Sequence, residues 1–316
     1  MNVRSLHRAR TTAGIIAAIM LLAVTFCVHR VYAAAGMPEF QTVKQIRYTK
    51  SAAWLFQEPK ASAPKAVKLK KSRKVRVTGI SKAGWSRVYD SKKTYYIRSE
   101  RLSRNNGYFV AIDAGHQKKG NPAKEPIGPG AKQKKAKVSS GATGTSTGIP
   151  EYKLTLKMAK KLKKELVSRG YKVKLIRAKH NVNISNSRRA KIANKAGADV
   201  FIRIHANSST DSGVKGALTI SPTAENKYCK KISKKCRGLS RAVLSEFCEV
   251  TGAKNRGVMY TDTMSGINWS KVPVTIVEMG FLSNPKEDKK MNRSVRYQNK
   301  MAKGMANGID RFLKRT

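Results

Sequence analysis

Cysteine is scarce in this chain, and its scarcity limits how the fold can be stabilised. The 316 residues include only four cysteines, Cys27, Cys229, Cys236 and Cys248, and no C-x-x-C pair. Cys229 and Cys236 are expected to share one helix. Seven residues of helix rise would place them about 10 Å apart, which is too far for a disulfide. We therefore expect no disulfide framework.

Acidic residues are the second shortage. The chain has 18 aspartates and glutamates against 66 lysines and arginines, which gives a formal net charge of +48 at pH 7. Such a charge predicts attraction to a polyanion, whether a nucleic acid, an anionic lipid surface or an acidic wall polymer. With 40% apolar residues the composition is globular, and the length favours two domains, or one domain plus a small module.

The first 35 residues have the layout of an export signal. Basic residues between positions 4 and 10 precede an apolar run at 13–28, and three small residues follow at 33–35. His29 and Arg30 are awkward for cleavage. Residues 1–35 are therefore interpreted as either a signal peptide or a membrane anchor. An exported protein does not meet nucleic acid. We thus expect an extracytoplasmic protein, secreted to the cell wall or anchored to the membrane, whose charge attracts an anionic wall polymer or a membrane surface. Oligomeric state stays open.

Residues 36–45 are expected to form a short linker, and residues 46–104 have a β-rich pattern. Apolar and polar residues alternate in four short segments, at 67–70, 74–79, 86–89 and 95–98. This alternation is typical of half-buried strands and predicts a small antiparallel barrel. The segments 49–55, 74–79 and 84–88 resemble a bacterial SH3-like domain. The resemblance implies a wall-binding module, although a spacer or packing domain fits equally well.

From residue 108 onward the pattern changes to strands that alternate with helices. Apolar residues recur every four positions in 151–168, which predicts an amphipathic helix that begins after Pro150 and ends at Gly170. The stretch 117–148, rich in glycine, proline and lysine, is expected to be a long loop. Further helices are expected at 187–196, 226–250 and 296–313, and strands at 108–112, 173–176, 199–204, 216–220, 257–260 and 274–277. Residues 108–316 are therefore predicted to form a three-layer α/β domain around a mostly parallel sheet.

Two histidines and two glutamates occupy the positions where such a sheet builds its site. His116, His205 and Glu278 each follow an apolar run, and Glu151 begins a helix. Because ligands bind at the carboxyl ends of parallel strands, we expect these side chains to lie close together. Histidine with carboxylate suits a catalytic zinc that keeps one position open, and a further carboxylate can act as the base for water. The separations between the four residues exclude a local H-E-x-x-H helix.

Several segments resemble one enzyme family in its own order. They are 112–116, 148–151, 189–194, 198–207 and 277–284, and together they make residues 108–316 resemble the zinc-dependent N-acetylmuramoyl-L-alanine amidases of the amidase 3 family. The resemblance implies that His116, Glu151 and His205 bind Zn²⁺ and that Glu278 is the catalytic glutamate. It also implies hydrolysis of the amide bond between N-acetylmuramic acid and L-alanine in peptidoglycan.

The chain departs from this family after the first motif. Many members have glycine where this chain has Gln117 and a lysine-rich loop, which affects the expected substrate range rather than the chemistry. Asp113 and Asn207 are not expected to be ligands; Asp113 would orient a histidine or cap a turn. Arg189 is left outside the site because an ion pair explains it equally well. Two alternatives stay open: a non-catalytic wall-binding or regulatory protein, and a zinc peptidase acting on wall stem peptides.

Overall fold

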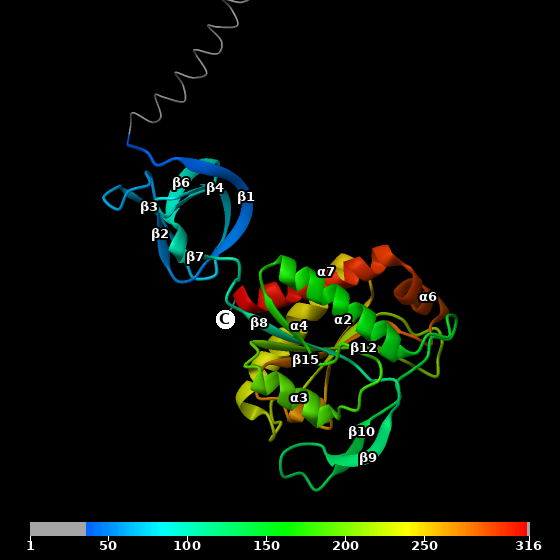
Figure 1. Ribbon diagram of the computed structural model, residues 1–316. Helices are drawn as coiled ribbons and strands as arrows, with labels where there is room; N and C mark the ends of the chain where they lie inside the picture. The colour runs from blue at the N-terminus through cyan, green and yellow to red at the C-terminus, as the bar shows by residue number, and fades with distance from the viewer. Residues whose placement is uncertain (1–35, 315–316) are drawn as a thin grey trace, which may run out of the picture. The chain divides into compact units, whose positions relative to one another are not determined.

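The computed structural model describes residues 36–314, which fall into two units with the boundary along the chain between Asn106 and Gly107 (Figure 1). The expected signal peptide or anchor at 1–35 lies outside the described residues. None of the helices in the described part of the chain combines the length and apolar character needed to span a membrane.

The N-terminal unit is an antiparallel sheet of seven strands in the order β3-β2-β6-β5-β4-β1-β7. Alternation places every second side chain inside, and Leu55, Val77 and Val88 are completely buried. The strands are β1 (Phe40–Thr49), β2 (Ala53–Phe56), β3 (Lys65–Leu69), β4 (Lys74–Ser81), β5 (Trp85–Asp90), β6 (Lys93–Arg98) and β7 (Leu102–Ser103), with a 3-10 turn at Ser99–Arg101.

The expected linker at 36–45 differs from the structure in one respect. Strand β1 begins at Phe40, which pairs with Ser81 of β4 and packs its ring 5.5 Å from that of Tyr96. Residues 40–45 are therefore part of the sheet. Most of the polar residues between the apolar ones in this segment face outward. The segment is therefore polar in composition, which led to the prediction of a linker instead of a strand.

The C-terminal unit has a six-stranded sheet in the order β11-β8-β12-β15-β13-β14. All neighbouring strands run parallel except β13 and β15, so the sheet is mixed and mostly parallel, as predicted. The strands are β8 (Phe109–Ala114), β11 (Lys172–Leu175), β12 (Val200–Asn207), β13 (Ala217–Ser221), β14 (Asn255–Tyr260) and β15 (Val274–Phe281).

Helices cover both faces of this sheet and complete three layers (Figure 1). Helices α2, α4 and α7 pack with the sheet in one hydrophobic cluster. Helix α3 and the short α5 belong to a second cluster, to which Cys236 of α4 also contributes. Helix α2 follows the predicted four-residue period, because Leu154, Met158, Leu162 and Leu166 are completely buried. The helices are α2 (Glu151–Ser168), α3 (Asn186–Lys195), α4 (Lys230–Thr251), α5 (Ser265–Asn268), α6 (Pro285–Arg293) and α7 (Val295–Lys314).

The prediction of a long loop at 117–148 was wrong in part. This stretch contains an antiparallel hairpin of β9 (Asn121–Pro126) and β10 (Lys134–Val138). Its inner side holds Glu125, which is buried and accepts hydrogen bonds from the backbone N–H and the hydroxyl of Ser187 in α3. A hairpin anchored by a carboxylate carries no apolar alternation, so periodicity could not reveal it.

Helices α4 and α7 approach each other through glycine. A β-carbon added at Gly308 would lie 2.3 Å from the α-carbon of Val243, and one at Gly304 would lie 2.8 Å from the α-carbon of Phe247. Since these contacts are with backbone atoms, a side chain could not be accommodated by a rotamer change. The two glycines therefore set the distance between the helices.

We predict that Gly308→Ala lowers the free energy of unfolding by about 1–3 kcal/mol, because the added methyl group must push α7 away from α4. Urea denaturation followed by circular dichroism measures the change. Gly238→Ala in α4 is the matched control, since the nearest atom to its added β-carbon is 3.8 Å away. This control should be neutral or stabilising. Equal effects of the two substitutions would contradict the close-packing argument.

Candidate functional site

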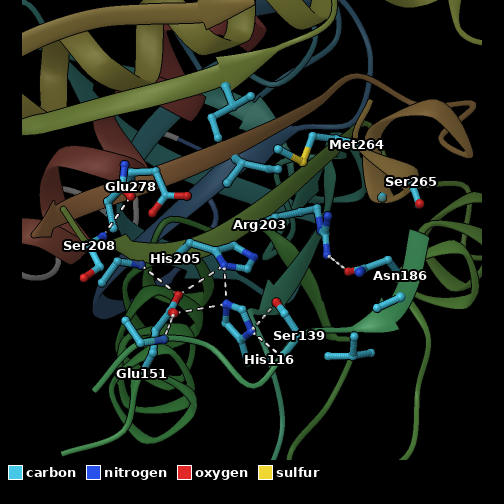
Figure 2. A pocket seen from close by; sticks show the side chains of 18 of the residues that line it. His116, Ser139, Glu151, Asn186, Arg203, His205, Ser208, Met264, Ser265 and Glu278 are labelled. Atoms are coloured by element: carbon cyan, nitrogen blue, oxygen red, sulfur yellow. Dashed lines mark hydrogen bonds and ion pairs between the residues drawn. The ribbon is translucent and has the colours of Figure 1, made fainter. Parts of the chain in front are cut away.

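All four side chains singled out in the sequence line one cleft of about 480 Å³ at the carboxyl edge of the sheet (Figure 2). His205 of β12 and Glu278 of β15 are partners in the parallel pairing and share one face of the sheet. His116 follows the end of β8, and Glu151 is the first residue of α2. The topology thus brings together residues up to 162 positions apart in the chain.

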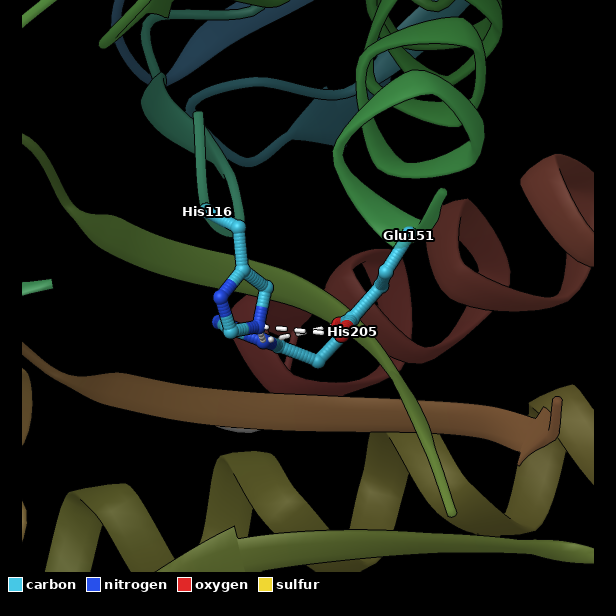
Figure 3. Close-up of side chains that lie close together, drawn as sticks. All are labelled: His116, Glu151 and His205. Carbon is cyan, nitrogen blue, oxygen red and sulfur yellow. Dashed lines mark hydrogen bonds and ion pairs between the residues drawn. The ribbon is translucent and has the colours of Figure 1, made fainter. Parts of the chain in front are cut away.

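Three of these side chains converge on one point (Figure 3). The Glu151 carboxylate lies 3.0 Å from Nε2 of His116 and 3.2 Å from Nδ1 of His205, and the two ring nitrogens are 3.1 Å apart. Four donors at about 2.0 Å around a tetrahedral zinc would be about 3.3 Å from one another. The spacing and the chemistry of His116, Glu151 and His205 therefore fit a metal ion.

Hydrogen bonds orient the metal-binding atoms of His116 and Glu151. Nδ1 of His116 donates to the carbonyl oxygen of Ser139 at 2.9 Å, so the lone pair of Nε2 faces the cluster. The backbone N–H groups of Ala142 and Ala206 donate to the Glu151 carboxylate, each at 3.0 Å. Burial opposes ionisation of Glu151, but its contacts with His116 and His205 hold its pKa well below the ordinary value. Burial lowers the pKa of His205 to about 4, which keeps its ring neutral at neutral pH.

The turn after β8 allows the two rings to approach. His116 adopts a left-handed backbone conformation with φ of 57°, an uncommon state that is frequent at functional sites. A β-carbon at Gly115 would lie 2.4 Å from Cε1 of His205. Gly115 itself has no positive φ, so only the ring of His205 excludes a larger residue there.

Glu278 stands apart from this cluster. Burial, together with the charge of Glu151, raises the pKa of Glu278 to about 8. Its Oε2 atom and Nε2 of His205 are buried and have no hydrogen-bond partner among the described residues. Glu278 is therefore a carboxyl group beside the metal-binding cluster that can hold or release a proton near neutral pH.

Asp113 and Arg189 have a structural role that the sequence left undecided. Asp113 is completely buried and accepts hydrogen bonds from Arg189 at 2.8 Å and from Arg203 at 2.9 Å. Among the described residues, no hydrogen bond joins the Asp113 carboxylate directly to a histidine. Instead, Arg189 also donates to the carbonyl oxygens of Ala114 and His116, and so holds the turn that carries His116. Asn207 accepts a hydrogen bond from the N–H of Ser208 at the end of β12.

Two arginines near the site were missed. Arg177 donates to the carbonyl oxygens of Ala114, Gly115 and Tyr152, and so joins the end of β8 to the start of α2. Arg203 lines the cleft itself. Its spacing of two residues from His205 puts both side chains on one face of β12, and this signal was present in the sequence.

Comparison with known proteins agrees with the site. Residues 110–311 match the family model described as N-acetylmuramoyl-L-alanine amidase. The chain belongs to this amidase 3 family. A putative N-acetylmuramoyl-L-alanine amidase of Buchnera aphidicola subsp. Baizongia pistaciae is 28% identical over 233 residues, which cover 66% of this chain and 97% of that relative. The family predicted from the five motifs is thereby confirmed.

Solved structures of the family have the same fold. The catalytic domain of CwlV, an N-acetylmuramoyl-L-alanine amidase from Bacillus (Paenibacillus) polymyxa var. colistinus, superposes with a TM-score of 0.52 at 29% identity, covering 66% of this chain and 98% of that domain. Ami1 from Mycobacterium smegmatis superposes with a TM-score of 0.60 at 21% identity and covers 66% of this chain and 98% of its own. The second likeness concerns the fold alone.

We predict that Gly115→Ala displaces the ring of His205 and lowers the bound metal well below one ion per chain. The backbone conformation at position 115 permits alanine. The substitution should therefore lower the metal content while the urea midpoint changes little. Metal content by plasma mass spectrometry and the urea midpoint are to be measured together, with Gly238→Ala as control. Full metal occupancy in Gly115→Ala would show that the ring contact does not position the ligand.

A second prediction concerns the pH dependence of stability. Burial raises the pKa of Asp113, but the charges of Arg189 and Arg203 outweigh this effect and lower it to about 2 from the model-compound value of 3.8. Because the folded pKa is the lower one, ionised Asp113 stabilises the fold fully above about pH 4, by about 2 kcal/mol, and this contribution disappears as the pH falls through 2.

Asp113→Asn should therefore lower the free energy of unfolding at pH 7 by about 3–5 kcal/mol, because it leaves two buried guanidinium groups without a counter-charge. The difference from the unsubstituted protein should shrink between pH 4 and pH 2. Urea denaturation at several pH values measures the difference in the free energy of unfolding at pH 7 and its change between pH 4 and pH 2. A difference that is independent of pH in this window would contradict the assignment.

Proposed function

We propose that the chain is a zinc-dependent hydrolase of the amide bond between N-acetylmuramic acid and L-alanine in peptidoglycan. The observation that carries the proposal is the convergence of two imidazoles and a carboxylate within 4.8 Å, with Glu278 beside them in a cleft. Membership of the amidase family supports the same activity.

His116, Glu151 and His205 are proposed as the zinc ligands. In a set of two imidazoles and one carboxylate, only the carboxylate offsets the charge of a divalent cation, and three donors leave a fourth position open. When bound, zinc supplies Lewis-acid chemistry: it acidifies water to a pKa of about 7 and polarises a carbonyl oxygen. The protein holds its own donors in place through Ser139, Ala142 and Ala206.

Glu278 is proposed as the catalytic residue. It would take the proton of the attacking water and return it to the departing nitrogen of alanine, which leaves as a neutral amine. A raised pKa suits this exchange, since a base works best when its pKa lies near the operating pH. The buried, unpaired Oε2 atom is available for the proton.

The other two candidate activities find less support. A non-catalytic wall-binding or regulatory protein would have no need of Glu278, yet this carboxyl group is buried beside the cluster at a cost in desolvation. A zinc peptidase acting on stem peptides uses similar donors and differs only in the bond that is cut. The products of digestion therefore distinguish it.

The N-terminal unit, predicted from the sequence over residues 46–104 and begun in the fold by β1 at Phe40, is proposed to be an SH3-like wall-binding domain, joined to the catalytic domain over 108–316. Trp54 is 37% exposed, and the ammonium groups of Lys65 and Lys68 lie 5.8 Å and 5.7 Å from its ring centroid. An exposed aromatic ring flanked by two cations suits contact with sugar rings and anionic groups.

The positive charge is proposed to hold the protein at an anionic wall polymer or membrane surface outside the cytoplasm. Lysines of the β9–β10 hairpin contribute to it beside the cleft, where Lys135 is among the lining residues. We propose that residues 1–35 provide export, as a cleaved signal peptide or as an anchor.

Digestion of purified peptidoglycan by the chain without residues 1–35 tests the function. The products are read by mass spectrometry, with a chelator and after zinc is added back. Free stem peptides that begin at L-alanine, beside intact glycan strands, are expected to disappear with chelator and return with zinc. Cuts within the stem peptide would favour the peptidase, and wall binding without any cleavage would favour the non-catalytic protein.

We predict that Glu278→Gln retains one zinc ion per chain and loses turnover by about a hundredfold or more, because the amide cannot accept the proton. Glu151→Gln is the matched variant, and it should lose the metal as well as activity. Metal content and initial rates on peptidoglycan separate the two. Loss of zinc in Glu278→Gln, to the same extent as in Glu151→Gln, would make Glu278 a ligand or a structural residue instead.

A further inference from the structure

Arg203 is a charged group in the wall of the cleft that the chemistry above does not use. It lies two residues before His205 in β12, and its side chain is only 4% exposed. Even so it lines the cleft, together with Asn186, Met264, Ser265 and Gly266 (Figure 2). Burying a charged guanidinium group costs free energy unless the group is paired and hydrogen-bonded, so its partners matter.

Two of its three nitrogens are held in place. Nε donates to Asp113 at 2.9 Å and Nη2 donates to the side-chain oxygen of Asn186 at 2.6 Å. The third, Nη1, forms no hydrogen bond within residues 36–314 and rests against Gly266, where an added β-carbon would lie 1.8 Å from it. The guanidinium group is therefore oriented by two partners and has one nitrogen left for a ligand.

The charges around Arg203 do not balance. Asp113 is shared with Arg189, whose remaining hydrogen bonds go to uncharged oxygen atoms. Glu125 acts on Arg203 through its charge, but its oxygens bind Ser187. Arg177, buried nearby, adds a further cation bound only to uncharged oxygens. Arg177, Arg189 and Arg203 together carry one positive charge more than Asp113 and Glu125 balance. Arg203 is the arginine of this group that lines the cleft, where its charge also acts on Glu278.

We propose that Arg203 forms a subsite for a carboxylate of the substrate peptide, close to the bond that is cut. The α-carbons of Arg203 and His205 lie two residues apart along β12, about 7 Å, and both side chains line the same cleft. In a stem peptide whose second residue is linked through its side chain, the free α-carboxylate lies about 5–7 Å from the scissile nitrogen. A carboxylate so close to the scissile bond would lie in the cleft that both side chains line. The inference rests on the proposed function and adds the substrate class.

The consequence is a preference between two natural forms of this group. A guanidinium group binds a carboxylate with charge-assisted hydrogen bonds, whereas a neutral amide offers it one acceptor and no charge. Of the other ionisable groups that line the cleft, Glu151 and Glu278 are carboxyl groups and do not attract an anion. Lys135 of the β9–β10 hairpin is a second cation there, but no hydrogen bond or ion pair among the described residues orients its side chain, whereas Asp113 and Asn186 hold Arg203 in place. The preference is therefore assigned to Arg203.

The test uses two synthetic muramyl peptides, muramyl-L-alanyl-D-glutamate and its α-amide, with the zinc-loaded full chain. The protein should cleave the acid with a kcat/KM at least about tenfold above that of the amide, mainly through a lower KM. Arg203→Gln should bring this ratio close to one. Arg188→Gln removes the same charge from an exposed position outside the cleft and should keep the ratio.

Gly266→Ala provides a second variant, since its methyl group displaces the guanidinium group without removing the charge, and it should lower the ratio as well. Equal cleavage of acid and amide by the unsubstituted protein overturns the carboxylate subsite and leaves the amidase intact. A preference that survives both substitutions assigns it to another group and also overturns the inference. Cleavage of neither peptide, nor of peptidoglycan, counts against the proposed function itself.

Discussion

The site depends on one buried carboxylate that two arginines share. Asp113 lies at the end of β8 and binds Arg189 of α3 and Arg203 of β12 without any exposed surface of its own. Through Arg189 the same ion pair reaches the carbonyl oxygens of Ala114 and His116. Two strands, a helix and the turn that carries a proposed metal ligand are thereby held in a single network. Removing one member would leave charges buried without partners, at a large cost in stability.

The cleft beside this network has two parts with different chemistry. At one end, two histidines and a glutamate present acceptor atoms, and hydrogen bonds with backbone groups fix the orientation of His116 and Glu151. At the other end, Arg203 presents a cation. Glu278 stands beside the first part, in a position where burial makes its proton easy to gain and lose near neutral pH. The proposed metal ligand His205 and the proposed recognition residue Arg203 lie two positions apart on β12, with α-carbons about 7 Å from each other.

Much of this was accessible from the sequence, because strand ends and helix starts are local signals. The four-residue period of α2 and the apolar runs before His205 and Glu278 led to the correct sheet and to four residues that share one cleft. The hairpin at 121–138 was not accessible, since a buried Glu125 replaces its apolar core. Helix α6 could have been found, because Asn284 and Pro285 form an ordinary helix start. Arg189 and Arg203, the partners of Asp113, lie far from it in the sequence, so no local sequence pattern could predict these ion pairs.

The central claim is that His116, Glu151 and His205 hold zinc beside Glu278. Anomalous diffraction at the zinc edge, from crystals of the zinc-loaded protein, tests it most directly. The account predicts one strong peak at about 2.0–2.2 Å from Nε2 of His116, Nδ1 of His205 and a Glu151 oxygen. A protein that cleaves peptidoglycan but shows no peak there, or whose zinc is bound by other residues, would contradict the account.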